Sequence, residues 1–140
     1  MNIHSVAGMA VISADTESSA TLYCDVMGLD MKTEDDYRYT NQLDGAKHFG
    51  IWSLNDAANA CYGTELWPDN VPVPQTTIEF EFRDTQAVAD AVNEMKEKGY
   101  TFVHDVRMEP WGQTLARFIS PEGVLIGLSY APWQHGDEQK

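Results

Sequence analysis

The chain contains an internal repeat, and this repeat restricts its fold more than any other feature of the sequence. The segment "AVISADTESSATLYCDVMGLDM" begins as a strand, meets Asp15 and Thr16, and continues as a helical pattern that stops at Gly28. The segment "IEFEFRDTQAVADAVNEMKEKGYTF" repeats this order with an Asp-Thr pair and a later glycine. Asp or Thr before a helical pattern is a typical N-cap, and glycine after it is a typical stop. The sequence therefore predicts two copies of a strand–helix unit.

Three short strands follow each predicted helix. They are "LDMKTED", "YRYTNQL" and "HFGIWSL" in the first copy, and "YTFVHDV", "QTLARFI" and "VLIGLSY" in the second. Each copy is thus β-α-β-β-β, which makes the predicted fold class α+β. We expect a single domain over 1–140, with one module at 5–54, a connector at 55–75, a second module at 76–131 and a disordered tail at 134–140.

The helical spacing of apolar residues predicts which helix faces pack in the core. These residues are Leu22, Tyr23, Val26 and Met27 in the first helix, and Val88, Ala91, Val92 and Met95 in the second. Three prolines in the connector favour a loop there, with room for one helical turn at 56–62.

The chain is strongly acidic, with 22 acidic residues against 9 basic ones and a formal net charge of -13. This balance argues against nucleic acid as a partner, since nucleic-acid binding needs clustered Lys and Arg. It favours a cationic small molecule or surface, although solubility alone also explains it. No apolar run is long enough to span a bilayer, and the N-terminus lacks the basic and apolar regions of a signal peptide. We therefore expect a cytoplasmic protein with no membrane partner.

Apolar and polar residues alternate in "TTIEFEFR", residues 76–83. The apolar side chains must pack on the helices, so Glu79 and Glu81 are expected on the concave, open face. Solvated acids and ligand-binding acids both fit that position. Ser129 shares the face with Gly127, a glycine inside a strand, but no Gly-x-Ser-x-Gly motif or partner base accompanies this serine.

The strand "HFGIWSL" has two alternative phasings. Its apolar pattern places Phe49 and Ile51 against the helix and leaves His48, Gly50 and Trp52 on the open face. Counting from the Asp-Gly turn before it would instead place Phe49 on the open face. We prefer the apolar phasing, because burial fixes the face of a strand. His48 fits both a polar residue at the edge of the sheet and a ligand contact.

Two segments resemble the vicinal oxygen chelate superfamily, which includes glyoxalases, bleomycin-resistance proteins and extradiol dioxygenases. "ADTESSATLYCDVMGL" is similar to the family's opening motif and "PWGQTLARFISPEGVLIGL" to its ending motif, and the resemblance covers residues 5–131. It implies two βαβββ modules that form a curved, cup-like mixed sheet, often completed by a partner chain.

In metal-using members of this superfamily, four side chains line the cup. The resemblance carries these positions to Gly8, Gly50, Thr77 and Gly127. Three glycines and a threonine do not make a divalent metal site, which needs imidazole or carboxylate ligands. We therefore expect no metal and no other cofactor, and we expect the glycines to leave room for a bulky ligand.

The resulting hypothesis is a protein that binds a small cationic or aromatic organic molecule without catalysis, as in antibiotic sequestration or metabolite binding. The residues expected to contact the ligand are His48, Gly50, Trp52, Glu79, Glu81, Trp111, Gly127 and Ser129. A metal-dependent lyase, isomerase or dioxygenase with displaced ligands is the first alternative, and a protein interaction module is the second. A two-fold homodimer is expected, because an open sheet leaves apolar surface and strand edges to cover.

Overall fold

The computed structural model describes residues 1–136, and the chain divides into two compact units. One consists of Met1–Ala7 with Ile78–Lys140, and the other of Gly8–Thr77. Strands β1 (Ser5–Ser13) and β5 (Thr76–Glu81) each have residues in both units. Inside the Gly8–Thr77 unit, Ile12 N donates to Gln75 O at 2.9 Å, and inside the other unit His4 N donates to Glu81 O at 2.8 Å. The chain therefore passes from one unit to the other within both strands.

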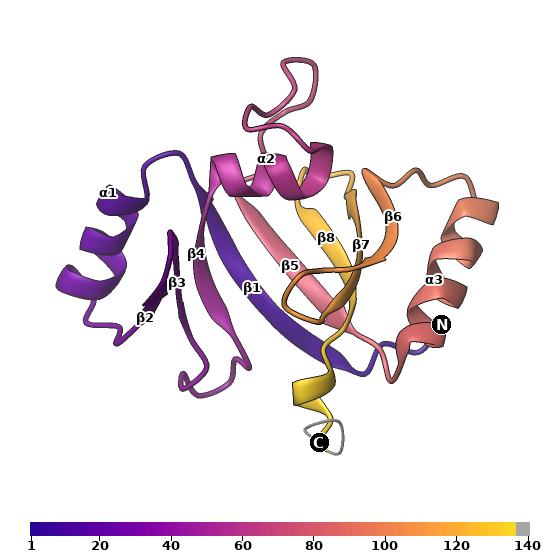
Figure 1. Ribbon diagram of the computed structural model, residues 1–140, viewed down its shortest axis with the longest axis horizontal. Coiled ribbons are helices and arrows are strands. Elements are labelled where there is room, and N and C mark those ends of the chain that lie inside the picture. Colours follow the sequence, from indigo (N-terminus) through magenta and orange to yellow (C-terminus); the bar gives the residue numbers. More distant parts are fainter. Residues whose placement is uncertain (137–140) are drawn as a thin grey trace. The chain divides into compact units, whose positions relative to one another are not determined.

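The Gly8–Thr77 unit holds the first module. After β1 come α1 (Thr16–Ala20), the π-helical turn η1 (Thr21–Val26), β2 (Lys32–Glu34), β3 (Tyr37–Thr40) and β4 (Phe49–Ser53) (Figure 1). The strand order is β2-β3-β4-β1, with β1 and β4 parallel and the other pairs antiparallel. The Asp15 side chain accepts a hydrogen bond from Ser18 N at 3.2 Å, which confirms the predicted N-cap.

A complete helix, α2 (Leu54–Tyr62), replaces the loop expected at the start of the connector. The Ser53 side chain accepts from Asp56 N at its N-terminus, and Gly63, with φ +75°, ends it. The helical turn expected at 56–62 is therefore present but longer than one turn, because all the connector's prolines lie at position 68 or later. The earlier segment has an N-cap, small residues that bury well, and a glycine stop.

The other unit holds the second module. Its elements after β5 are α3 (Thr85–Glu97), β6 (His104–Met108), β7 (Thr114–Ile119), β8 (Leu125–Tyr130) and the short 3₁₀ helix η2 (Pro132–Gln134) (Figure 1). The strand order is β5-β8-β7-β6. The α+β class and the two βαβββ modules are confirmed.

Helix α3 packs as its sequence predicts. Its N-cap Asp84 accepts from Ala87 N at 2.8 Å, and Gly99 follows the helix with φ +97°. The core of this unit is formed by α3, β7, β8 and the residue that directly follows β5. Its buried apolar residues are Phe82, Val88, Ala91, Val92, Ala116 and Leu128. Removal of these apolar side chains from water supplies most of the stability of this unit.

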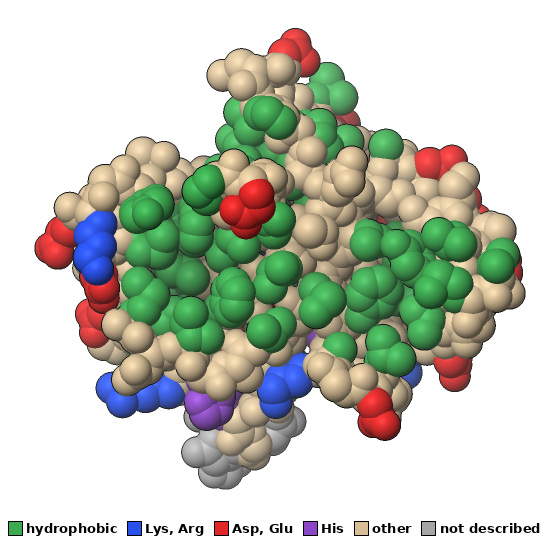
Figure 2. All heavy atoms as spheres, turned by 180° about the vertical axis from the view of Figure 1, so that it is seen from behind, with side chains coloured by type: hydrophobic (Ala, Val, Ile, Leu, Met, Phe, Trp, Pro, Cys, Tyr) green, Lys and Arg blue, Asp and Glu red, His purple; other side chains and the backbone are tan. Residues whose placement is uncertain are grey.

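The first helix differs from its predicted packing. Val26 and Met27 were expected in the core but are 73% and 59% exposed, and Leu22 is also exposed. Tyr23 does contact the sheet, with its ring 5.6 Å from that of Phe49. The spacing failed because the helix widens into a π turn after α1, so a period of 3.6 residues no longer marks one face. Figure 2 shows hydrophobic side chains exposed at the surface.

The predicted disordered tail begins too early. Gln134 ends η2 and its Nε2 donates to Ala7 O at 3.0 Å, while His135 Nε2 lies 2.8 Å from Glu81 Oε2. Residues 137–140, also part of that prediction, lie outside the described residues. Among the residues that are described, no helix is long and apolar enough to cross a membrane.

Candidate functional site

The faces of β4 follow the apolar phasing. Phe49 packs on the helical side against Tyr23, so the alternative count from the turn was wrong. On the other face, a Cβ added to Gly50 would lie 2.2 Å from the Tyr37 hydroxyl. Trp52 follows two residues later and is partly exposed. His48, Gly50 and Trp52 therefore share one face of the Gly8–Thr77 unit.

Three side chains, those of Asn41, His48 and Tyr37, are joined by hydrogen bonds on this face. His48 Nδ1 is 2.7 Å from Asn41 Oδ1, and the Tyr37 hydroxyl bonds to His48 Nε2. An amide oxygen only accepts, so Nδ1 carries the imidazole proton and Nε2 accepts the proton of Tyr37. Burial lowers the pKa of His48, which favours the neutral ring.

Three aromatic rings stack on each other beside these hydrogen bonds. Those of Tyr37, Tyr39 and His48 lie 5.5 to 5.7 Å apart between centroids. A Cβ added to Gly8 would lie 2.9 Å from His48 Cβ. The chain's own tyrosine and histidine thus occupy the space beside Gly50 and Gly8, where we had expected room for a ligand.

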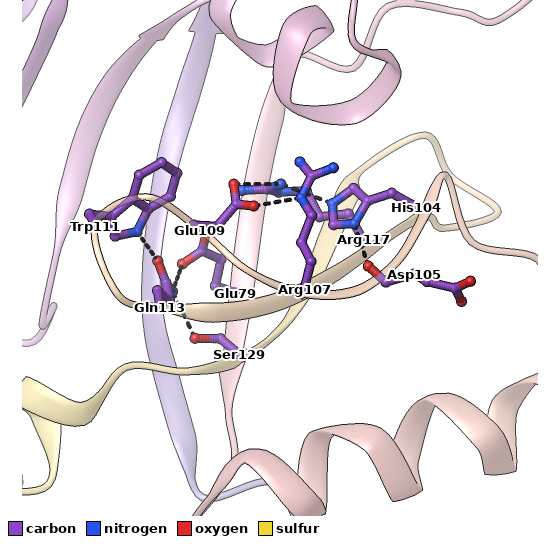
Figure 3. Close-up of polar contacts among 9 residues, drawn as sticks. All are labelled: Glu79, His104, Asp105, Arg107, Glu109, Trp111, Gln113, Arg117 and Ser129. Atoms are coloured by element: carbon purple, nitrogen blue, oxygen red, sulfur yellow. Dashed lines mark hydrogen bonds and ion pairs between the residues drawn. The ribbon is translucent and has the colours of Figure 1, made fainter.

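In the other unit, one glutamine organises a polar network (Figure 3). Gln113 is only 6% exposed. Its Nε2 donates to Glu79 Oε1 at 2.9 Å and to Ser129 Oγ at 2.7 Å, and its Oε1 accepts from Trp111 Nε1 at 2.7 Å. Three residues predicted for the site, Glu79, Trp111 and Ser129, are therefore connected through a residue that was not predicted.

The two acids of β5 have different environments. Glu81 is fully buried and accepts from Ser129 Oγ at 2.7 Å, from Ala131 N at 2.5 Å and from His135 Nε2 at 2.8 Å. The expectation that Glu81 lines an open face was wrong, because the C-terminal segment covers it. Glu79 remains partly exposed, and Gln113 is its hydrogen-bond partner among the described residues.

The pKa of Glu79 is raised. Burial disfavours its charged form, and the nearby Arg117 guanidinium and the bond from Gln113 oppose this only in part. Such a carboxyl group exchanges its proton nearer to neutral pH than an ordinary glutamate does. Perturbed groups of this kind are common at functional sites.

Gly127 has a structural explanation. An added Cβ would lie 3.0 Å from Glu79 Cγ and 3.1 Å from Leu115 Cδ2. The strand carries glycine because the stem of Glu79 crosses it. The expectation that this glycine leaves room for a bulky ligand is therefore corrected.

An arginine-rich cluster continues the network of this unit (Figure 3). Arg117 is fully buried, and its NH1 lies 2.9 Å from His104 Nε2 and 3.5 Å from Glu109 Oε2. Arg107 Nε donates to Glu109 Oε1 at 2.6 Å. Burial, followed by the charges of the two arginines, lowers the pKa of His104.

Sequence reasoning missed Gln113 and Arg117, although a signal for both was present. In β7, Leu115 pairs with Ser129 and Arg117 with Gly127. Alternation along this strand therefore places Arg117 on the face of the predicted site residues, and Gln113 belongs to the quoted "PWGQ" corner.

The residues at the four metal-ligand positions do not fit a metal ion. They are Gly8, Gly50, Thr77 and Gly127, and the space beside each glycine is filled by another side chain of the protein. Over residues 1–136, no group of three or more His, Cys, Asp or Glu side chains is arranged to hold a metal. We derive no chemical step through a metal.

Comparison with known families identifies the group to which this protein belongs. Residues 3–128 match the Glyoxalase/Bleomycin resistance protein/Dioxygenase superfamily. The chain is a member of this superfamily. A comparison with curated proteins found no match to this chain.

Solved structures of other proteins share its fold. A member from Vibrio splendidus 12B01 is 15% identical with a TM-score of 0.59, over 93% of this chain and 100% of that one. The Mn(II)-bound glyoxalase from Novosphingobium aromaticivorans is 18% identical with a TM-score of 0.60, over 91% of this chain and 39% of that one. A Streptomyces coelicolor methylmalonyl-CoA epimerase in complex with 2-nitronate-propionyl-CoA is 16% identical with a TM-score of 0.55, over 93% of this chain and 99% of that one. At these identities the likeness shows the fold alone.

Proposed function

We propose that this superfamily member binds a small organic cation with an aromatic or apolar body, without converting it, at Glu79 and Trp111. The observation that carries the proposal is the double role of Gln113, which holds the Glu79 carboxylate and the Trp111 indole at once. Trp111 is 53% exposed although its N–H is bonded, so its ring is held in place and accessible. A preorganised site loses little conformational freedom when it binds.

The chemistry of the two groups suits a cation. A close carboxylate contributes roughly 1 to 4 kcal/mol of Coulomb attraction, depending on solvent access. Contact with the face of a tryptophan adds about 0.5 to 2 kcal/mol. The net charge of -13 draws cations toward the protein over longer distances. Drug sequestration and metabolite binding both fit this chemistry.

The raised pKa of Glu79 gives the proposal a proton signature. A bound cation stabilises the ionised carboxylate, so it lowers the pKa of Glu79. Below the raised pKa, binding must then release a proton. A neutral ligand on Trp111 would release none.

A thermal-shift screen of organic cations, each beside a neutral analogue of the same shape, tests the proposal. The best cation is then titrated into the wild type, Glu79→Gln and the control Glu97→Gln, which removes an exposed acid of α3. We expect Glu79→Gln to lose about tenfold or more in affinity and most of the salt dependence, while Glu97→Gln matches the wild type. Equal affinities and equal salt slopes for all three proteins would refute the proposal.

We also propose that the protein forms a two-fold homodimer. The exposed apolar residues Leu22, Val26 and Met27 of the first helix support this, because such groups commonly mark interfaces. The partner is a second copy of this chain. Cytoplasmic location stays a prediction.

A further inference from the structure

We propose that Asn41, His48 and Tyr37 form a proton relay that makes the Tyr37 hydroxyl a nucleophile toward acyl compounds. The relay lies within the Gly8–Thr77 unit and shares no residue with the Glu79–Trp111 site. It is therefore a second site, with its own substrate class: small molecules that carry an electrophilic acyl carbon.

The direction of the hydrogen bonds supports this role. Asn41 Oδ1 accepts the proton of His48 Nδ1 at 2.7 Å, which fixes the tautomer in which His48 Nε2 has a lone pair to accept a hydrogen bond. The Tyr37 hydroxyl donates to that lone pair. A base in contact with a hydroxyl, and itself oriented by a third group, is the arrangement that activates weak nucleophiles.

Two glycines make this geometry possible. Any larger residue at Gly50 would meet the Tyr37 hydroxyl, and any larger residue at Gly8 would meet the His48 side chain. Stacking of the tyrosine and histidine rings holds their planes together. Tyr37 and His48 are both partly exposed to solvent.

The step is balanced within the protein and water. The Tyr37 oxygen forms a bond to the acyl carbon while the phenolic proton passes to His48 Nε2. The bond from the acyl carbon to the leaving group breaks, and the leaving group takes up that proton. Water then attacks the acyl-tyrosine and gives its proton to His48, and the acid is released as the Tyr37 hydroxyl is restored.

Tyr39 provides a matched comparison within the same strand. Its ring stacks on the same histidine at 5.5 Å, but its hydroxyl donates to the Glu34 carboxylate at 3.3 Å. The charge of Glu34 raises the pKa of Tyr39, which makes this phenol harder to ionise. The Tyr37 hydroxyl therefore donates to a neutral imidazole, whereas the Tyr39 hydroxyl donates to a charged carboxylate.

Acetylation by N-acetylimidazole, followed by peptide mass mapping over time, tests the relay on the full chain. We expect Tyr37 to acetylate about tenfold or more faster than Tyr39, since general-base assistance typically contributes at least that much. His48→Gln should reduce the Tyr37 rate to that of an ordinary tyrosine, Asn41→Ala should reduce it in part, and Tyr39→Phe should leave it unchanged.

The exposed Tyr100, in the other unit, is the internal reference for reagent activity in every variant. The proposal is overturned if Tyr37 reacts no faster than Tyr39 in the wild type, a result that needs no variant to fold. It is also overturned if a folded His48→Gln protein acetylates Tyr37 as fast as the wild type. Neither result would affect cation binding at Glu79 and Trp111, so the two proposals fail separately.

Discussion

The two modules repeat the same order of elements but fill equivalent positions differently. In the first module, Gly50 of its last strand lies beside the Tyr37 hydroxyl. In the second, Gly127 of its last strand lies beside the stem of Glu79. The comparison shows that a glycine at a former ligand position does not mean an empty space. Each module fills that space with a different polar side chain, a tyrosine in the first and a glutamate in the second.

The helices differ as much as the sheets. Helix α3 is a regular helix with three fully buried residues, whereas α1 has five residues and continues as a π turn in which Leu22 and Val26 are exposed. The second module thus has a core of its own. The first module leaves apolar residues of its helix exposed.

The largest expected effect compares the two helices. Val92→Ala removes a buried side chain of α3 and should lower the free energy of unfolding by about 2 to 3 kcal/mol, through lost burial and the cavity left behind. Val26→Ala, at an exposed position, should change it by less than about 0.5 kcal/mol. Urea denaturation of both variants measures this. Similar losses would mean that the two helices are equally well packed.

The next comparison concerns the two glycines. Gly50→Ala should cost about 1 to 2 kcal/mol, because the new methyl group meets the Tyr37 hydroxyl at 2.2 Å and separates it from His48. Gly127→Ala should cost less, since the closest contact of its new methyl group, the Glu79 Cγ, lies at 3.0 Å rather than 2.2 Å. The reverse order in urea denaturation would contradict this account of how each space is filled.

A smaller effect follows from the raised pKa of Glu79. The folded state holds this proton more tightly than the unfolded state, so stability is lost as pH rises above about 4.5 through the raised pKa. Glu79→Gln removes that loss. The stability of the Glu79→Gln variant relative to the wild type should therefore increase from pH 4 to pH 7, as measured by denaturation of both proteins at each pH. A constant difference would show that the pKa of Glu79 is ordinary.

The smallest expected change in stability belongs to a variant that tests assembly. Val26→Asp places a charge on the exposed helix surface of the first module and should barely change the stability of a single chain. It should convert the proposed dimer to a 15.7 kDa monomer in light scattering. Asp substitution at exposed Leu66, in the connector, is the control and should leave the dimer intact. A monomeric wild type at micromolar concentration would rule out the dimer.

Local patterns in the sequence predicted the elements and much of their packing. The Asp-Thr caps and the glycine stops depend on neighbouring residues, and each is confirmed by the structure. The alternation of β5 correctly placed Phe82 in the core, but it wrongly left Glu81 on an open face. The widening of the first helix left no trace in the apolar spacing, so its exposed face was not predicted.

The site was predicted where a single strand defines it and missed where distant segments meet. Alternation alone gave Glu79 and Glu81 the same environment. They differ because His135, from a segment expected to be disordered, reaches back to Glu81. Tyr37 was not predicted as a site residue, since its bond to His48 depends on the course of the loop between β3 and β4.

The sharing of β1 between the two units has a consequence for the order of folding. Gly8–Thr77 is continuous in the sequence, so it can form as soon as it is synthesised. The first seven residues must wait for β5, because His4 bonds to Glu81 across most of the chain. These residues are thus synthesised before the Gly8–Thr77 unit but are placed after it. Their pairing brings a long loop closure into folding, which slows that step.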